Sequence, residues 1–162
     1  MPPPHEPPDT FRFNTLRTTG GSTRLTLVKA AVQEAGIEPR PPRPELAHLP
    51  AAPGVWLALD VDRHSEQARR VAVRTAVSEA FGVESPIVGE FPVELQGKLG
   101  SAVTLVPRQL VDRAALESGT PVTTIAVGPG ALLFVIQPVV DAEPAAVTAA
   151  IAAAREALDP GG

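Results

Sequence analysis

The chain lacks several side chains on which common protein sites depend. Its 162 residues include no cysteine and no tyrosine. The absence of cysteine excludes a disulfide framework, a thiolate zinc site and a cysteine nucleophile. The three histidines, His5, His48 and His64, lie far apart, and their spacing is not typical of metal ligands. We therefore expect neither a metal site nor a bound cofactor.

Positive charge and long apolar runs are also scarce. The formal net charge is −4, so the chain shows no basic footprint of the kind that nucleic-acid-binding proteins carry. No apolar run approaches the roughly 20 residues that a membrane-spanning helix needs. Residues 1–8 are too polar and too rich in proline for a signal peptide. These features predict a cytoplasmic protein that binds neither nucleic acid nor membranes.

The remaining composition is ordinary for a soluble globular domain. Hydrophobic residues make up 44% of the chain and charged residues 20%, so a core can form without disulfides. We expect a flexible, proline-rich leader over residues 1–9 and a single globular domain over residues 10–160. Residues 38–54 contain six prolines, which predicts an irregular or polyproline connection with room for one helical turn over residues 45–49.

Apolar residues at helical spacing predict helices in the first half of the chain. One helix is expected to begin after Ser22, a favourable N-cap residue, and to end at Gly36. A second is expected over residues 65–81, where alanine, valine and phenylalanine form one face. Its opposite face, which we expect to be solvated, carries Glu66, Arg70, Arg74 and Ser78.

Strand patterns complete the predicted fold. A short strand is expected over residues 9–17, a buried strand over residues 54–62, and an antiparallel hairpin over residues 122–140 with type II turn chemistry at Pro129 and Gly130. Two further strands flank a turn at 97–100, and helices are predicted at 109–118 and 142–158, the latter capped by Asp141. The sequence thus predicts an α/β or α+β fold, in which a mixed sheet with this late hairpin carries three or four helices.

The first candidate site is the turn Gly20-Gly21-Ser22, which the predicted elements place between a strand and a helix. Backbone N–H groups at the start of a helix attract anions, and glycine lets a phosphate approach closely. Arg70 and Lys98 are the cationic side chains that we consider as partners of such an anion. The plainer interpretation, which we favour, is a capped turn, an arginine on a solvated helix face and a lysine in a hairpin.

The second candidate site is Asp60-Val61-Asp62, at the end of an apolar strand. Carboxylates there can bind a divalent cation or act as acid and base, because strand ends open into clefts in α/β proteins. His64 follows closely, and histidine titrates near neutral pH. The spacing resembles the Asp-x-Asp motif of haloacid-dehalogenase-type phosphotransferases, but Arg63 and His64 follow where that motif has threonine or valine, which excludes the family. The plainer interpretation is a turn before a helix.

Two classes of function follow. The leading hypothesis is a non-catalytic binding or assembly module, because no catalytic constellation is recognisable and the apolar hairpin at 122–140 needs cover on both faces. That cover comes either from the chain's own helices or from a partner, such as a second copy in a homo-oligomer. The alternative is a small enzyme or anion-binding protein, which requires the Gly20-Gly21 turn, Asp60, Asp62, His64 and Lys98 to meet in one concave pocket.

Overall fold

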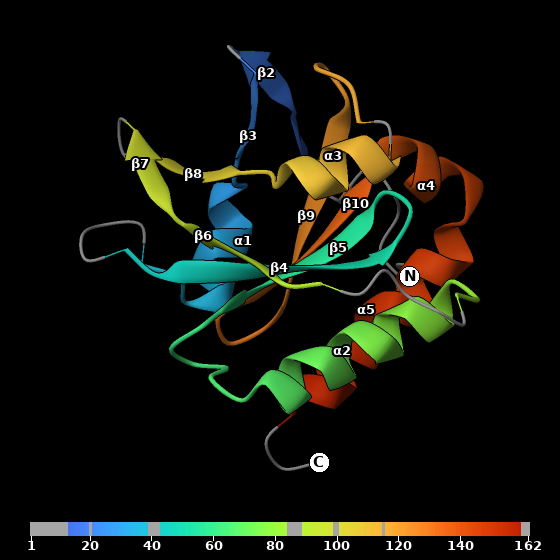
Figure 1. The fold of residues 1–162 in the computed structure, drawn as a ribbon. Helices are drawn as coiled ribbons and strands as arrows, with labels where there is room; N and C mark the ends of the chain where they lie inside the picture. The colour runs from blue at the N-terminus through green and yellow to red at the C-terminus, as the bar shows by residue number, and fades with distance from the viewer. Residues whose placement is uncertain are drawn as a thin grey trace, which may run out of the picture.

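The computed structural model in Figure 1 describes residues 13–19, 21–38, 43–83, 89–98, 101–114 and 116–159. The predicted leader over residues 1–9 lies outside this part of the chain, as does Gly20. In chain order the elements are β1 Phe13–Thr15, β2 Arg17–Thr19, β3 Ser22–Thr26, α1 Lys29–Ala35, β4 Glu45–Ala52, β5 Val55–Asp60, α2 Gln67–Ala80, β6 Phe91–Glu94, β7 Gln96–Lys98, β8 Ser101–Leu105, α3 Arg108–Ala114, β9 Pro121–Gly128, β10 Ala131–Ile136, α4 Gln137–Ala142 and α5 Pro144–Leu158.

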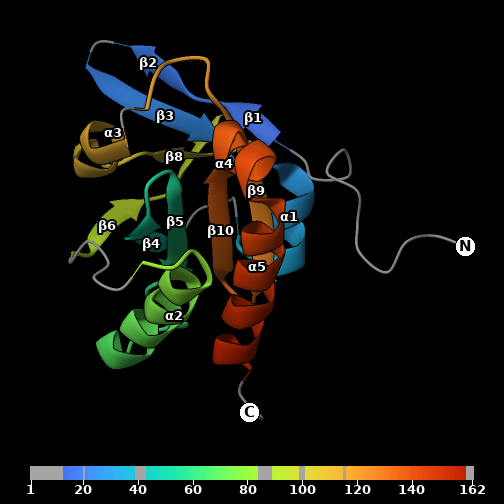
Figure 2. The same ribbon diagram turned by 90° about the vertical axis from the view of Figure 1, so that its right-hand side faces the viewer.

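The strands form two sheets. Sheet A has the order β1-β9-β10-β5-β4-β6, and sheet B has the order β2-β3-β8-β7. Every pairing between described strands is antiparallel. Sheet B, α1 and α3 cover one face of sheet A, while α2 and α5 pack side by side and cover the other (Figure 2). This arrangement places the fold in the α+β class, one of the two predicted alternatives.

The late hairpin is confirmed, and the chain itself buries it. β9 and β10 pair around a turn in which Pro129 and Gly130 occupy the central positions, and the φ of Gly130 is +66°. Alternate residues of β10 from Leu132 to Val135 belong to the two separate hydrophobic cores, one on each face of sheet A. The cover that we assigned either to helices or to a second copy therefore comes from within one chain. The homo-oligomer stays a prediction.

Gly130 occupies a position where any side chain would be both strained and crowded. An added Cβ would lie 2.8 Å from Arg63 Cδ and 3.0 Å from Asp60 Cβ. We expect Gly130→Ala to lower the free energy of unfolding by about 2 kcal/mol, measured by urea denaturation. Gly36→Ala is the matched control, because its φ is also near +67° but its nearest neighbour, Arg63 Nη1, is 3.4 Å away. Equal losses in the two variants would contradict the crowding.

Residues 22–26 form a strand, so the helix predicted to begin at Ser22 is wrong in its first part. β3 pairs with β2 and β8, and its alternating residues Thr23 and Leu25 are buried. Leu25 satisfies both a helical and a two-residue period, and sheet pairing decides between them. α1 begins only at Lys29 and ends, as predicted, at Gly36 in the left-handed conformation.

The helix predicted at 142–158 also begins differently. Asp141 lies inside a short preceding helix, α4, and does not cap α5. Glu143 is the residue before α5, and Pro144 takes the first helical position, where proline loses no intrahelical hydrogen bond.

The proline-rich connection predicted over residues 38–54 contains a buried strand, β4, and no helical turn at 45–49. β4 pairs with β5 along its length and with β6 only from Glu45 to His48. Pro50 is tolerated because no described strand pairs with β4 beyond His48 on that side, so no ladder hydrogen bond is lost. A register shift between Pro50 and Ala52 marks an irregularity at the same place. Proline content alone therefore predicted too much irregular chain.

Candidate functional site

Three of the four side chains on the polar face of α2 that we expected to be solvated are buried, whereas Glu66, just before the helix, is exposed. Arg70 and Arg74 are only 8% and 7% exposed, and Ser78 is fully buried. Ser78 Oγ donates a hydrogen bond to the carbonyl of Ala51 in β4 at 2.8 Å, so this face packs toward sheet A. Helical spacing cannot distinguish polar side chains that face water from those that form hydrogen bonds inside the protein, which explains the wrong prediction.

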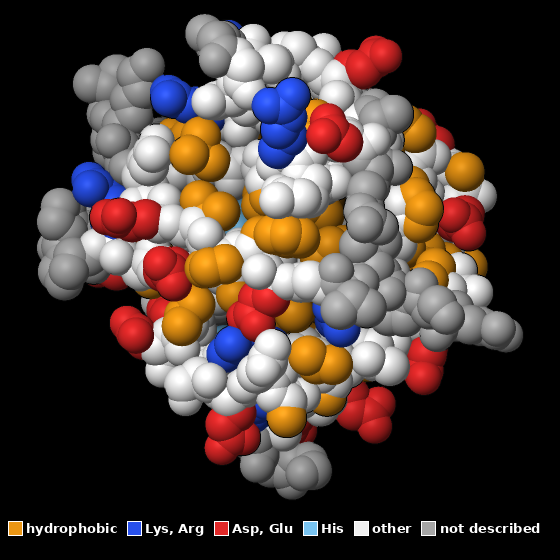
Figure 3. Space-filling model, in the orientation of Figure 1, with side chains coloured by type: hydrophobic (Ala, Val, Ile, Leu, Met, Phe, Trp, Pro, Cys, Tyr) orange, Lys and Arg blue, Asp and Glu red, His pale blue; other side chains and the backbone are white. Residues whose placement is uncertain are grey.

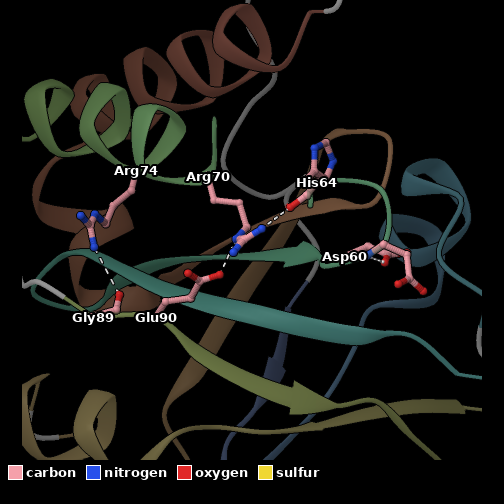
Figure 4. A network of polar contacts seen from close by, with 7 residues as sticks. Asp60, His64, Arg70, Arg74, Gly89 and Glu90 are labelled. Carbon is pink, nitrogen blue, oxygen red and sulfur yellow. Dashed lines mark hydrogen bonds and ion pairs between the residues drawn. The ribbon is translucent and has the colours of Figure 1, made fainter. Parts of the chain in front are cut away.

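Arg70 lies at the centre of the network drawn in Figure 4. Its Nε donates to Oε1 of Glu90, and its Nη1 donates to the carbonyl of His64. One turn further along α2, Arg74 Nη1 donates to the carbonyl of Gly89 at 3.2 Å. Burial lowers the pKa of Arg74, and the Glu90 carboxylate acts in the opposite direction. The two arginines thus attach α2 to the segment that leads into β6.

Asp60, Asp62 and His64 lie together at the end of β5. Asp60 Oδ1 accepts a hydrogen bond from the backbone N–H of Asp62 at 2.9 Å, which is the bond of an Asx turn. His64 Nε2 lies 2.6 Å from the carbonyl oxygen of Pro129. A carbonyl oxygen only accepts, so Nε2 carries the proton and ties this loop to the β9–β10 turn. Both bonds match the plainer interpretation of these residues as turn residues.

Two further arginines bind the carboxyl ends of helices. Arg63 donates to the carbonyl of Gly36 at 3.1 Å, just past the end of α1. Arg69 Nη2 donates to the carbonyl of Leu158 at 3.2 Å, the last residue of α5. The last carbonyls of a helix lack intrahelical partners, and a cation there also interacts favourably with the helix dipole. Arg63 therefore connects the loop between β5 and α2 to α1, and Arg69 connects α2 to α5.

Of the candidate anion-binding residues, Arg70 lies beside His64, whereas Gly21, Ser22 and Lys98 lie in a different part of the molecule. Gly21, with a φ of +86°, belongs to the turn between β2 and β3, and Ser22 is exposed at the start of β3. Lys98 belongs to β7. All three are in sheet B, whereas Asp60 ends β5 near the start of α2, at the other end of the molecule (Figure 1). The convergence that the enzyme alternative requires does not occur among these residues.

His48 is a buried polar residue to which sequence analysis gave no role. Its ring is fully buried in β4, stacks on Phe134 with a centroid distance of 6.2 Å, and places Nε2 3.1 Å from Thr104 Oγ1 of β8. Burial lowers its pKa to about 3, so the ring is neutral at physiological pH. His48 therefore joins the two sheets. We missed it because we had assigned residues 45–49 to an irregular segment.

An apolar pocket lies at the turn between β4 and β5. Its volume is about 240 Å³ including its opening to solvent, below the usual size of ligand pockets. None of the candidate residues lines it, and no group of three or more metal-ligating side chains occurs in the described part of the chain. The pocket is lined by Ala52, Pro53, Gly54, Val55, Trp56, Leu110 and Ala114.

Sheet B buries one face and exposes the other, which we call its outer face. The register places Arg17 opposite Arg24, and Arg24 opposite Leu105; Thr26 lies opposite Val103 in a neighbouring row. The two arginines are exposed, and neither forms an ion pair with a described residue. Hydrophobic side chains also gather over β4, β6 and β8 on the side drawn in Figure 3. These two arginines, which form no ion pair with a described residue, thus lie in one row with the apolar side chain of Leu105.

Comparison of the chain with protein-family models, with curated proteins and with solved structures found no match. No helix in the described ranges is long and apolar enough to cross a membrane. Function therefore has to be argued from the side chains that the fold buries, pairs or leaves exposed.

Proposed function

We propose that this protein is a non-catalytic, cytoplasmic binding module that recognises a partner through the outer face of sheet B. The observation that carries the proposal is the Arg17–Arg24 pair. Like charges directly opposite each other on neighbouring strands destabilise a sheet, and cross-strand pairs contribute roughly 0.2–1 kcal/mol. No described carboxylate compensates these two charges. Sequences depart from such local rules mainly at functional sites, so the pair points to binding.

The remaining polar candidates support binding over catalysis. Asp60 holds a turn, His64 is bonded to the Pro129 carbonyl, and Arg70 is paired with Glu90. Each of these groups already has an internal partner that a substrate would have to displace. The outer face of sheet B, by contrast, offers cations and apolar side chains directly to solvent.

Photo-crosslinking tests the proposal. Thr26 is exposed on the outer face, and we would replace it with a photo-crosslinking phenylalanine analogue in cells that naturally make the protein. The matched control carries the same analogue at Ala149, an exposed position of α5. We expect discrete adducts from position 26 that are absent from position 149. No adduct from position 26, or the same adducts from both positions, would contradict the proposal.

A further inference from the structure

We infer that the partner is a protein segment in which acidic side chains alternate with apolar ones, lying across the outer face of sheet B. This inference rests on the proposed function and adds the chemistry of the partner. It follows from four features of the surface: the spacing of the arginines, the apolar side chains beside them, the occupied edge of β2, and the absence of aromatic side chains from the described outer face.

The two arginines are spaced for carboxylates on one extended segment. Arg17 and Arg24 lie directly opposite each other on neighbouring strands, which are about 4.8 Å apart in a sheet. In an extended segment, side chains two residues apart point to the same side and are separated by roughly 7 Å. Each guanidinium presents a planar fork that matches a carboxylate, so two acids in an i, i+2 relation can engage the pair.

Apolar side chains adjoin the arginines in the same rows. Leu105 lies directly opposite Arg24, and Val103 lies between Thr26 and Gln96. Both side chains are half-buried, so part of each remains open to a partner. Apolar side chains of the bound segment would remove this surface from water and would also strengthen the neighbouring charge pairs by excluding solvent.

Addition of a partner's strand at the outer edge of β2 does not explain the surface, because backbone N–H groups in and just before β2 already have partners. The backbone N–H of Thr18 donates to Ser118 Oγ at 3.1 Å, and that of Leu16 donates to the carbonyl of Thr120 at 2.9 Å. Main-chain groups of a partner would find these donors occupied. Beside the arginines of β2 and β3, recognition therefore depends on the side chains of the outer face.

The same surface is poorly suited to nucleic acid. Single strands bind mainly by stacking their bases on aromatic side chains. None of the described side chains of the outer face is aromatic. These side chains are Arg17, Ser22, Arg24, Thr26, Gln96, Val103 and Leu105. A duplex binder neutralises several phosphates, whereas the described side chains of this face include two arginines, in a chain of net charge −4. Two carboxylates on a bound protein segment would equal these two arginines in number and in charge.

Titration with synthetic peptides tests the inference. The probe is a soluble extended peptide containing Glu-Val-Glu. Two comparison peptides replace both glutamates with serine or with lysine, and a single-stranded oligonucleotide, titrated separately, is the third comparison probe. We expect only the glutamate peptide to shift backbone amide signals of β3 and β8. Its affinity should fall about tenfold in Arg17→Thr/Arg24→Thr, should weaken between about 50 and 300 mM salt, and should be unchanged in Arg108→Thr.

The outcomes separate this inference from the proposed function. Equal binding of the glutamate and serine peptides, undiminished binding by the double variant, or preferred binding of the oligonucleotide would overturn the acidic partner. If no peptide binds while position 26 still forms adducts in cells, the acidic chemistry is wrong and the binding module stands. If no peptide binds and position 26 forms no adducts in cells, the acidic partner and the binding module are both contradicted. The double variant removes a repulsive pair, so we expect it to fold and its unfolding midpoint not to decrease.

Discussion

Arg70→Met is expected to lower the free energy of unfolding by about 3 kcal/mol, measured by urea denaturation. The side chains of Arg70 and Glu90 are only 10% and 18% exposed, so their ion pair is largely removed from water. Removing one partner leaves the Glu90 carboxylate and the His64 carbonyl without their donor in a poorly solvated place. Breaking a buried pair in this way is strongly destabilising, whereas the intact pair adds little net stability.

Arg108→Met is the matched control for that experiment. Arg108 and Asp112 form an exposed pair at 3.8 Å, with side chains 86% and 68% exposed. Such a surface pair contributes less than about 0.5 kcal/mol. The double variant Arg70→Met/Glu90→Leu should recover part of the loss, because the Glu90 carboxylate is no longer left without Arg70, whereas Arg74 loses the favourable field of that carboxylate and keeps the recovery incomplete. Equal losses at Arg70 and Arg108 would contradict the structural role assigned to the α2 arginines.

The second large effect concerns the pH dependence of stability. Burial lowers the pKa of His48 from 6.5 to about 3 in the folded protein, whereas the unfolded chain takes up this proton near pH 6.5. Between these two values the unfolded state binds one more proton, so the free energy of unfolding falls as the pH falls. The slope is at most about 1.4 kcal/mol per pH unit. The contribution of neutral His48 is fully present above pH 6.5 and is lost progressively below it.

His48→Leu removes this proton uptake and isolates its effect. Thr104 Oγ1 still donates to the carbonyl of Leu105 at 3.1 Å in the absence of the ring, so the substitution leaves that hydroxyl with a partner. Between pH 7 and pH 4 we expect the wild type to lose roughly 3 kcal/mol more stability than the variant. Urea unfolding at a series of pH values measures both curves. Parallel curves would show that His48 is not held neutral by the fold.

Much of the fold could be predicted wherever a single periodicity dominates the sequence. The continuous apolar run before Asp60 gives β5, and proline and glycine at 129–130 give the turn of the β9–β10 hairpin. α2 was also predicted nearly to its bounds, because alanine and valine recur at helical spacing. In these segments local propensity and burial favour the same structure.

Other segments could not be predicted because tertiary partners decide them. Leu25 fits both helix and strand, and only pairing with β2 and β8 makes residues 22–26 a strand. The prolines suggested irregular chain at 45–52, but Pro50 lies where one side of β4 has no described neighbour.

The candidate site was predicted less well than the fold. The grouping of Asp60, Asp62 and His64 and the local bond from the Asp62 N–H to Asp60 follow from nearness in sequence, but the bond of His64 to the Pro129 carbonyl depends on the β9–β10 turn. The buried face of α2 depends on Glu90 and Gly89, which lie outside the helix. The Arg17–Arg24 pair had no signal in the sequence, because opposite positions emerge only from the register of β2 and β3.

The most direct measurement is the yield of crosslinked adducts from position 26 in the presence and absence of the arginine pair. With Arg17→Thr and Arg24→Thr added, we predict a loss of about tenfold in adduct yield, together with a free energy of unfolding that is unchanged or higher. An undiminished yield in a stably folded double variant would contradict the claim that these two arginines on sheet B recognise the partner.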